Sequence, residues 1–342
     1  MIIVMKPDAT KENIQKVEER LHQVGLKAHL STGEDCTIIG VIGDRKKIAN
    51  LEVSMLEGVE KTVRITEKYK LVSRHFHPED TIVDVDGVKI GGKEVVVMAG
   101  PCSVESEEQF NEVAECIASL GLHWIRGGAF KPRTNPHSFQ GLGEEALQIM
   151  KAGGDKYGLK TLTEVMDSEH CEMVHSYVDG LQVGARNFQN FSLLKNIGKV
   201  TKDSHKMVLF KRGFAGTIAE WLAATDYITM AGNDNVVLCE RGLRTFETAT
   251  RFTLDISAVP VIHKQSLYPI CVDVSHPAGV RDLVPALARA AVAVGADSIM
   301  IEVHPNPPAA LSDGPQQLTP AQFTDLIAEL RELAAVFGKK IV

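Results

Sequence analysis

Val95-Val96-Val97-Met98-Ala99-Gly100-Pro101-Cys102-Ser103 is an apolar run followed by a turn that carries a thiol and a hydroxyl. A nearly continuous apolar run is typical of a strand that is buried on both faces. After Ser103 the pattern becomes helical, with Phe110, Val113 and Ile117 on one face. The stretch therefore indicates a strand-helix unit in which polar residues directly follow the strand.

Seven further short apolar runs follow, separated by amphipathic helical segments. The runs are His123–Arg126, Lys160–Glu164, Gly180–Val183, Met207–Lys211, Val236–Glu240, Ile270–Asp273 and Ser298–Val303. The last intervening helix is expected to bury Val280, Leu283, Val284, Leu287, Ala288 and Ala291. Buried strands that alternate with helices indicate a parallel sheet. Eight such units favour a closed (β/α)8 TIM barrel over a doubly wound open sheet.

The first 70 residues follow a different order. We expect strands at Ile2–Lys6, Lys27–Ser31, Thr37–Ile42 and Thr62–Thr66, a helix that buries Ile14, Val17, Leu21 and Val24, and a second helix near Lys46–Leu56. This βαββαβ order predicts a small ferredoxin-like domain over residues 1–70.

Residues 71–92 are expected to join the two domains. Ser73–Asp80 has no periodicity and suggests a linker, and Thr81–Gly92 suggests a hairpin with Asp86-Gly87 as its turn. We expect this hairpin to plug the bottom of a barrel that spans residues 93–342.

Composition excludes several functional classes. Of 342 residues, 44% are apolar and 24% charged, and the net charge of −7 argues against nucleic-acid binding, which needs a basic face. No apolar run approaches the ~18 residues of a membrane span. The start of the chain suggests a strand rather than a signal peptide. The six cysteines form no C-x-x-C pair, which suits a reducing cytoplasm.

Every expected barrel strand delivers polar or charged groups at its carboxyl end, where barrel enzymes build their sites. One set is cationic: Arg126, Lys131, Arg133, Arg186, Lys211 and Arg241. Each cation alone is explained equally well by a strand-end ion pair. Together they favour anionic ligands, because clustered Arg and Lys bind phosphate and carboxylate.

The other set consists of Cys102, His276, Glu302 and Asp313. A thiolate, an imidazole and two carboxylates are suitable ligands for a divalent transition metal. Their spacing proves nothing, and a buried structural thiol and a hydrogen-bonded core histidine remain alternative interpretations of Cys102 and His276.

Six motifs together closely resemble 3-deoxy-D-arabino-heptulosonate 7-phosphate (DAHP) synthase, of the type I beta subclass with an N-terminal ferredoxin-like regulatory domain. They are Gly100-Pro101-Cys102-Ser103, Lys131-Pro132-Arg133-Thr134, Gly184-Ala185-Arg186-Asn187, Cys239-Glu240-Arg241-Gly242, Ser275-His276 and Glu302-Val303-His304-Pro305. The resemblance covers essentially the whole chain. It implies condensation of phosphoenolpyruvate with erythrose 4-phosphate, the first step of aromatic biosynthesis.

The resemblance also implies roles for individual residues. A manganese, iron, cobalt or zinc ion would be held by Cys102, His276, Glu302 and Asp313, the last assigned from Ser312-Asp313-Gly314. Phosphoenolpyruvate would be bound by Arg126, Lys131, Arg186, Lys211 and Arg241. The aldose phosphate would meet Lys131, Pro132, Arg133 and Thr134, and Ser275 is a further substrate-binding candidate. Lys131 is the expected proton donor or positioner, and Glu164 is expected to orient water.

The sequence departs from the expected motifs in two loops. Val274 and Pro277 flank Ser275-His276 where the family pattern has Pro and Ser, and Asn135 replaces a Ser. The alternative functions are 3-deoxy-D-manno-octulosonate 8-phosphate synthase, which uses arabinose 5-phosphate, and a catalytically dead amino-acid-sensing barrel. The octulosonate synthase lacks an N-terminal domain.

Nothing in residues 1–70 suggests catalysis, and the residues alone indicate a packing or oligomerisation module. The resemblance adds feedback control by tyrosine or phenylalanine and a homo-oligomer, perhaps a tetramer. His29 and Ser31 lie two apart on one strand face and are candidate effector contacts, although an ordinary exposed strand face explains them nearly as well.

Overall fold

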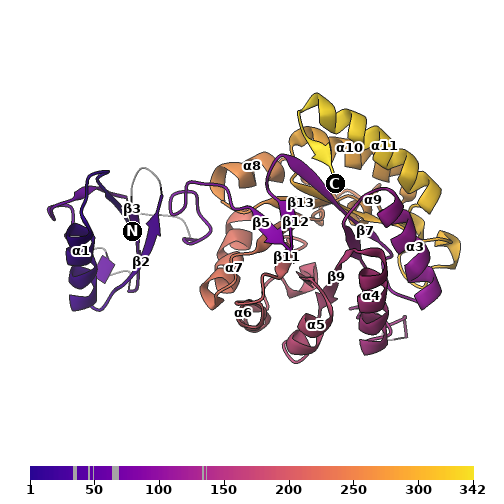
Figure 1. Ribbon diagram of the computed structural model, residues 1–342, viewed down its shortest axis with the longest axis horizontal. Helices are drawn as coiled ribbons and strands as arrows, with labels where there is room; N and C mark the ends of the chain where they lie inside the picture. The colour runs from indigo at the N-terminus through magenta and orange to yellow at the C-terminus, as the bar shows by residue number, and fades with distance from the viewer. Residues whose placement is uncertain (34–36, 45–46, 49, 64–68, 133–134, 136) are drawn as a thin grey trace. The chain divides into compact units, whose positions relative to one another are not determined.

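The computed structural model describes residues 1–342 except 34–36, 45–46, 49, 64–68, 133–134 and 136 (Figure 1). The chain forms two compact units, Met1–Glu79 and Asp80–Val342. In the described parts of the chain no helix is both long and apolar enough to cross a membrane.

The first unit contains β1 (Ile2–Met5), α1 (Lys11–Gln23), β2 (Lys27–Thr32), β3 (Thr37–Ile42) and β4 (Val59–Val63). The strands form an antiparallel sheet in the order β2-β3-β1-β4. Helix α1 begins at the capping residue Thr10 and buries Val17 and Leu21 against one sheet face. Phe76 covers Ile2 and Ile38 on the other face. The predicted ferredoxin-like fold is confirmed.

The segment before β4 differs from the prediction. Lys47 and Ile48 are helical, Lys46 and Ala49 lie outside the described residues, and residues 51–56 are not helical. Val53 is buried in the core beside α1 and is followed by tight turns, in which Leu56 N–H donates to Val53 O. The apolar residues whose spacing suggested a helix thus lie in turns. Strand β4 begins earlier than predicted, and the rest of the expected strand lies outside the described residues.

A hairpin fills the lower end of the second unit. Strands β5 (Val83–Val85) and β6 (Val88–Ile90) pair around Asp86 and Gly87, whose φ angles of 46° and 91° are left-handed. This geometry matches a type I′ turn, and the predicted hairpin is confirmed. Its apolar side chains pack into the barrel interior with those of Trp124, Met207 and Met300, among others.

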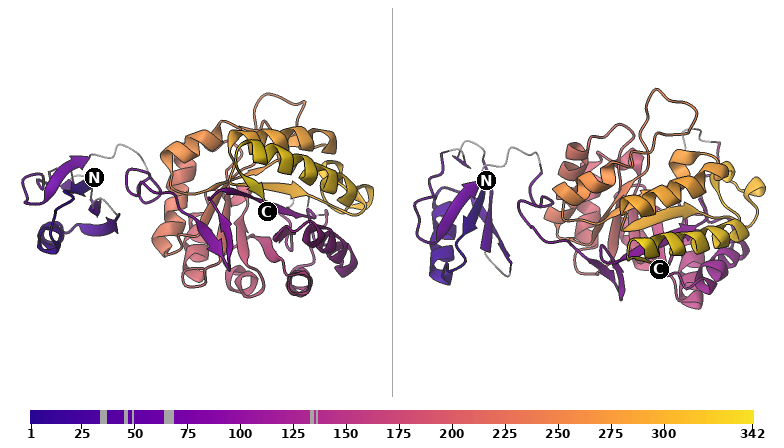
Figure 2. Two further views of the ribbon diagram at one scale, coloured as in Figure 1. Left: turned by 45° about the horizontal axis from the view of Figure 1, so that its top comes forward. Right: turned by 90° about the horizontal axis from the view of Figure 1, so that it is seen from above.

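The barrel itself has eight parallel strands, which are buried along nearly their whole length. Helices lie around the outside of these strands (Figure 2). They are β7 (Glu94–Gly100), β8 (Trp124–Arg126), β9 (Lys160–Val165), β10 (Gly180–Val183), β11 (Met207–Lys211), β12 (Val236–Glu240), β13 (Ile270–Asp273) and β14 (Ser298–Glu302). The sheet closes because β14 pairs with β7, and β15 (Lys340–Ile341) adds to the start of β7. The predicted closed barrel is confirmed, and the open sheet is excluded.

In the described parts of the chain, eight helices of seven or more residues lie between and after these strands, in addition to the one-turn helix α9 (Ser275–Ala278). They are α3 (Glu107–Ser119), α4 (Glu144–Tyr157), α5 (Cys171–Tyr177), α6 (Phe191–Val200), α7 (Ile218–Ala231), α8 (Ala258–Gln265), α10 (Val284–Val294) and α11 (Pro320–Val336). As predicted, α3 buries Phe110, Val113 and Ile117.

One part of the helix prediction was wrong. Val280 and Leu283 are 46% and 37% exposed, whereas Val284, Ala288 and Ala291 are buried as expected. The chain forms a 3-10 turn, η2 (Arg281–Leu283), before α10 begins. Side chains three apart eclipse one another in such a turn, so Val280 and Leu283 do not continue the buried face of α10.

The hairpin turn offers a clean test of backbone strain. An added Cβ at Gly87 or Gly92 meets no atom within 4 Å, but only Gly87 has a φ in the left-handed region. Gly87→Ala is therefore expected to destabilise the barrel by about 1 kcal/mol, or about 2–4 °C in thermal melting. Gly92→Ala is the matched control and is expected to cause no loss. Equal melting temperatures for the two variants would contradict the strained-turn account.

Candidate active site

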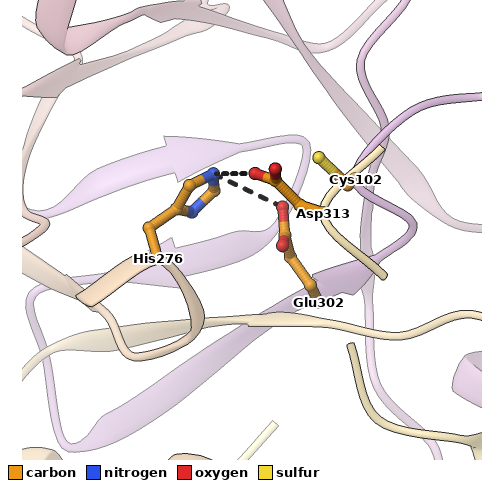
Figure 3. Close-up of side chains that lie close together, drawn as sticks. All are labelled: Cys102, His276, Glu302 and Asp313. Carbon is orange, nitrogen blue, oxygen red and sulfur yellow. Dashed lines mark ion pairs between the residues drawn. The ribbon is translucent and has the colours of Figure 1, made fainter. Parts of the chain in front are cut away.

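Four potential metal ligands meet at the carboxyl end of the barrel. Cys102 follows β7, His276 lies in α9 (Ser275–Ala278), Glu302 ends β14, and Asp313 lies between η3 (Pro307–Ala309) and η4 (Gly314–Gln316). One ligand atom from each residue lies within 4.8 Å of those of the other three. Figure 3 shows both carboxylates directed toward the imidazole, whose Nε2 is 3.5 Å from Glu302 Oε1 and 3.9 Å from Asp313 Oδ2.

Backbone geometry explains how two of these residues reach the site. Gly100 has a φ of 148°, and a Cβ there would lie 2.0 Å from Arg126 O, so only glycine fits before the turn that presents Cys102. The N–H of Cys102 donates to Gln317 Oε1 at 3.0 Å. Asp313 has a left-handed φ of 48°, a conformation that Asp tolerates better than most residues.

Asp273 fixes the orientation of His276. Its Oδ2 lies 2.7 Å from His276 Nδ1, and Lys211 Nζ donates to the same carboxylate at 2.6 Å. The imidazole therefore presents Nε2 to Glu302 and Asp313, as metal-ligating histidines do. Burial lowers the pKa of His276 below its ordinary value, which favours the neutral ring. The pKa of Asp273 is held well below its usual range by His276 and Lys211, against the effect of burial.

Cys102 is buried beside a cation. Burial, helped by the Glu302 carboxylate, raises the pKa of the Cys102 thiol to about 11. Lys131 Nζ donates to Cys102 Sγ at 3.1 Å and to Cys102 O at 3.0 Å. A bound metal would stabilise the thiolate, since metal ions deprotonate a coordinating thiol. The buried donor set, with one nitrogen, one sulfur and two carboxylates, fits a divalent transition metal.

A polar cavity of about 320 Å³ opens beside this cluster. Eight of its lining residues were predicted from the sequence to bind substrate or metal or to act in catalysis, namely Lys131, Pro132, Glu164, Arg186, Lys211, Arg241, His276 and Asp313. Arg126 does not line the cavity. It donates to Glu302 Oε1 at 3.0 Å and to Pro101 O at 2.8 Å. Arg133 and Thr134 lie outside the described residues.

The remaining predicted residues have other surroundings. Ser275 is fully buried, and its Oγ accepts the N–H of Glu302 at 2.9 Å, so it braces a metal-ligand candidate. The Glu164 carboxylate accepts a hydrogen bond from Gln182 Nε2 at 3.0 Å. It also lies against Gly184, where an added Cβ would be 2.0 Å from Glu164 Oε1. His29 and Ser31 lie on β2 in the N-terminal unit. The His29 ring packs against the Phe76 ring, with 5.0 Å between the two ring centroids.

Sequence reasoning missed three polar residues that support the site. Asp273 was identified only as a strand end, although its place three residues before His276 would have supported a role. Arg251 Nη1 lies 2.9 Å from Asp313 Oδ2 and 2.8 Å from Gln316 Oε1. Gln316 in turn donates to Glu302 Oε2 at 2.5 Å. Arg251 lies in an irregular loop and Gln316 in the short 3-10 turn η4, where no periodicity marks a residue as inward-facing.

Comparisons with known proteins agree with this architecture. A profile described as "DAHP synthetase I family" matches residues 65–336, and one described as "DAHP synthase ferredoxin-like domain" matches residues 1–67. A Thermotoga maritima protein named phospho-2-dehydro-3-deoxyheptonate aldolase is 50% identical over 341 residues, covering 100% of both chains. A Caulobacter vibrioides 2-dehydro-3-deoxyphosphooctonate aldolase is 32% identical and covers 71% of this chain and 89% of its own.

Solved structures of DAHP synthase also match this chain. The crystal structure of the Thermotoga maritima DAHP synthase matches with a TM-score of 0.79 and 48% identity, covering 100% of this chain and 98% of the other. A truncated form of that enzyme matches with a TM-score of 0.75 over 80% of this chain and 100% of the other. The profile match spans most of the sequence and includes all eight strands of the closed barrel and the four metal-ligand candidates, and the chain accordingly belongs to the DAHP synthetase I family.

Proposed function

We propose that this protein condenses phosphoenolpyruvate with D-erythrose 4-phosphate to give DAHP and inorganic phosphate. The observation that carries the proposal is one cavity lined both by cations and by two members of the four-ligand cluster. Such a cavity suits two phosphorylated substrates, one of which has a carbonyl oxygen to be polarised. The 50% identical relative is named for the same product.

Cys102, His276, Glu302 and Asp313 would hold the metal, and manganese, iron, cobalt and zinc all suit these donors. When bound, the metal supplies Lewis-acid stabilisation of negative charge on the aldehyde oxygen. Arg126 and Gln316 orient the Glu302 carboxylate, and Asp273 orients the imidazole. Such supporting contacts typically change metal affinity by about 10–100-fold.

The cations divide the work of binding. Phosphoenolpyruvate would be held in the cavity by Lys131, Arg186, Lys211 and Arg241. Arg126, which does not line the cavity and pairs with Glu302, would contribute its positive charge to this binding. Lys131 with Pro132, Arg133 and Thr134 would receive the aldose phosphate. Carbon-carbon bond formation leaves an electron-poor carbon that bears the phosphate, and water adds there before phosphate leaves. Glu164 would orient that water, and Lys131 would supply a proton.

The octulosonate synthase function remains the second candidate. Its relatives share about a third of their residues with this chain and leave about a quarter of it unmatched. The N-terminal domain profile and the fuller relative both favour the seven-carbon product. A dead sensor barrel is disfavoured by the convergence of the four metal-ligand candidates.

The ferredoxin-like unit would provide feedback control by tyrosine or phenylalanine. Its face opposite α1 carries His29 and Ser31 on the edge strand β2. We also propose a homotetramer and a cytoplasmic location; the five cysteines within the described residues are all free thiols, which suits a reducing compartment.

Phosphoenolpyruvate consumption is the direct test of the activity. The enol absorbance of phosphoenolpyruvate is expected to fall when erythrose 4-phosphate is present. This loss should stop after chelation and resume when metal is added back, because the carbonyl needs a Lewis acid. Loss only with arabinose 5-phosphate would establish the octulosonate synthase. No loss with either aldose after metal add-back would favour the sensor.

The same assay tests two residues. Glu164→Gln and Lys131→Met are each expected to lower kcat by at least about 100-fold, since positioned proton-transfer groups contribute about 10²–10⁴-fold. Unchanged turnover in either variant would remove that residue's proposed role.

Asp273 is expected to control metal affinity. Asp273→Asn removes the negative charge that lies 2.7 Å from His276 Nδ1, so affinity for Zn²⁺ or Co²⁺ should fall about 10–100-fold in competition titrations with a chromogenic chelator. Asp255→Asn is a matched control, because Asp255 pairs with a buried cation as Asp273 does, in this case Arg212 at 2.8 Å, and has no contact with His276 among the described residues. Equal metal affinity in the two variants would show that Asp273 does not orient the ligand.

Effector control is expected to depend on His29. His29→Ala should weaken inhibition by tyrosine or phenylalanine at least about tenfold and leave uninhibited turnover unchanged, because allostery requires a separate site with different affinities in two states. His22→Ala, an exposed histidine near the end of α1, is the control. Inhibition that survives in His29→Ala at wild-type strength would place the effector elsewhere.

A further inference from the structure

Two groups of cations near the cavity are held in different ways. They exclude Lys131, which contacts Cys102, and Arg251, which pairs with Asp313 at 2.9 Å and lies 5.8 Å from the centre of the Phe252 ring. Arg126, Lys211 and Arg212 are buried, and each pairs with a buried carboxylate. These partners are Glu302 at 3.0 Å, Asp273 at 2.6 Å and Glu240 at 2.8 Å, respectively. Their positive charge is therefore largely compensated within the protein.

Arg186, Arg241 and Arg244 form the second group. Among the described residues, none of the three has an ion pair with a carboxylate, and the buried Nη1 of Arg241 has no hydrogen-bond acceptor. A buried guanidinium nitrogen without an acceptor is costly unless a ligand supplies one. Arg186 and Arg241 both line the cavity.

Two phenylalanine rings hold this second group. The Cζ atoms of Arg186, Arg241 and Arg244 lie 5.7, 4.9 and 5.2 Å from the centre of the Phe214 ring. Arg241 also lies 4.0 Å from the centre of the Phe252 ring. Each of the three guanidinium groups thus lies close enough to the same ring to be attracted by its quadrupole.

The two rings form a pair that bridges two loops. Phe214 follows β11 and Phe252 precedes α8, and their centroids are 5.3 Å apart with the planes inclined by 9°. Arg244 N–H donates to Phe214 O at 2.7 Å, which ties the loops together through the backbone. A Cβ at Gly242 would lie 2.7 Å from Phe252 Cβ, so glycine allows the second ring to approach closely.

A ring and a carboxylate restrain a guanidinium group differently. A carboxylate occupies the N–H edge, whereas an aromatic ring contacts the flat face and leaves the N–H groups free. We propose that Phe214 and Phe252 are positioning residues that hold Arg186 and Arg241 by their flat faces, so that their N–H groups stay available to the phosphate of phosphoenolpyruvate. The proposal rests on the proposed function and names the residues that keep its phosphate site open.

The test is calorimetric titration of phosphoenolpyruvate into the full-length, metal-loaded protein and its variants. Phe214→Leu and Phe252→Leu keep apolar bulk but remove the ring, and each is expected to raise Kd about tenfold, within the range of a desolvated cation–π contact. Phe252→Tyr retains a ring and should restore Kd to within about twofold of wild type. KM should follow Kd, kcat should change less than about threefold, and Zn²⁺ affinity should not change.

Phe191→Leu is the matched control. Phe191 stacks on Tyr227 at 4.6 Å and has no guanidinium contact among the described residues, so its loss should leave Kd unchanged. Fluorinated phenylalanine at position 252 provides a variant of nearly native shape if a leucine variant does not fold. Kd should then rise with each added fluorine, because fluorine withdraws the charge from the ring face.

The outcomes separate the two proposals. Wild-type affinity in both leucine variants, or a Kd that does not respond to fluorination, would overturn the positioning role. Failure of the wild-type protein to bind phosphoenolpyruvate would contradict the proposed function instead. Titration with inorganic phosphate would then still test the aromatic pair, and an unchanged phosphate affinity in the leucine variants would overturn it.

Discussion

The parallel pairing of β14 with β7 is the constraint on which the site depends. It places Glu302 beside Gly100, although about 200 residues separate them in the chain. The turn that follows Gly100 then brings the Cys102 thiol close to the Glu302 carboxylate. Without closure the two halves of the ligand cluster would lie at opposite edges of an open sheet, so the barrel and the metal-ligand cluster form together.

Closure also buries charges that must compensate one another. Arg126, Glu302, His276, Asp273 and Lys211 form a continuous series of contacts from one side of the site to the other. Desolvation makes each charge expensive, and its neighbours repay that cost only while they remain in place. Removing a single member therefore affects both stability and the orientation of the groups that remain. Asp273, Ser275 and Gln316 are accordingly as deeply buried as Cys102 and Glu302, whereas Arg251, which pairs with Asp313, is exposed.

The barrel could be predicted from sequence because its strands are buried on both faces and appear as apolar runs. The same runs located Arg126, Glu302 and Asp273 at strand ends, where the fold brings them together. Loops carry no such signal, so Arg251 and Gln316 were missed, and Asp313 was assigned only through family resemblance. Apolar spacing was misleading where the chain makes tight turns, as at residues 51–56 and at Val280 and Leu283.

The hairpin β5–β6 affects the route by which substrates and products would enter and leave the barrel. Val83, Val85 and Ile90 pack with the side chains of the barrel interior, so the described residues fill the lower end of the barrel. A ligand of the cavity would accordingly enter and leave at the carboxyl end of the strands, where the lining residues lie. In the proposed reaction the departing phosphate would pass the arginines that receive the next phosphoenolpyruvate. The rate of phosphate release would then depend on how weakly those arginines bind an anion.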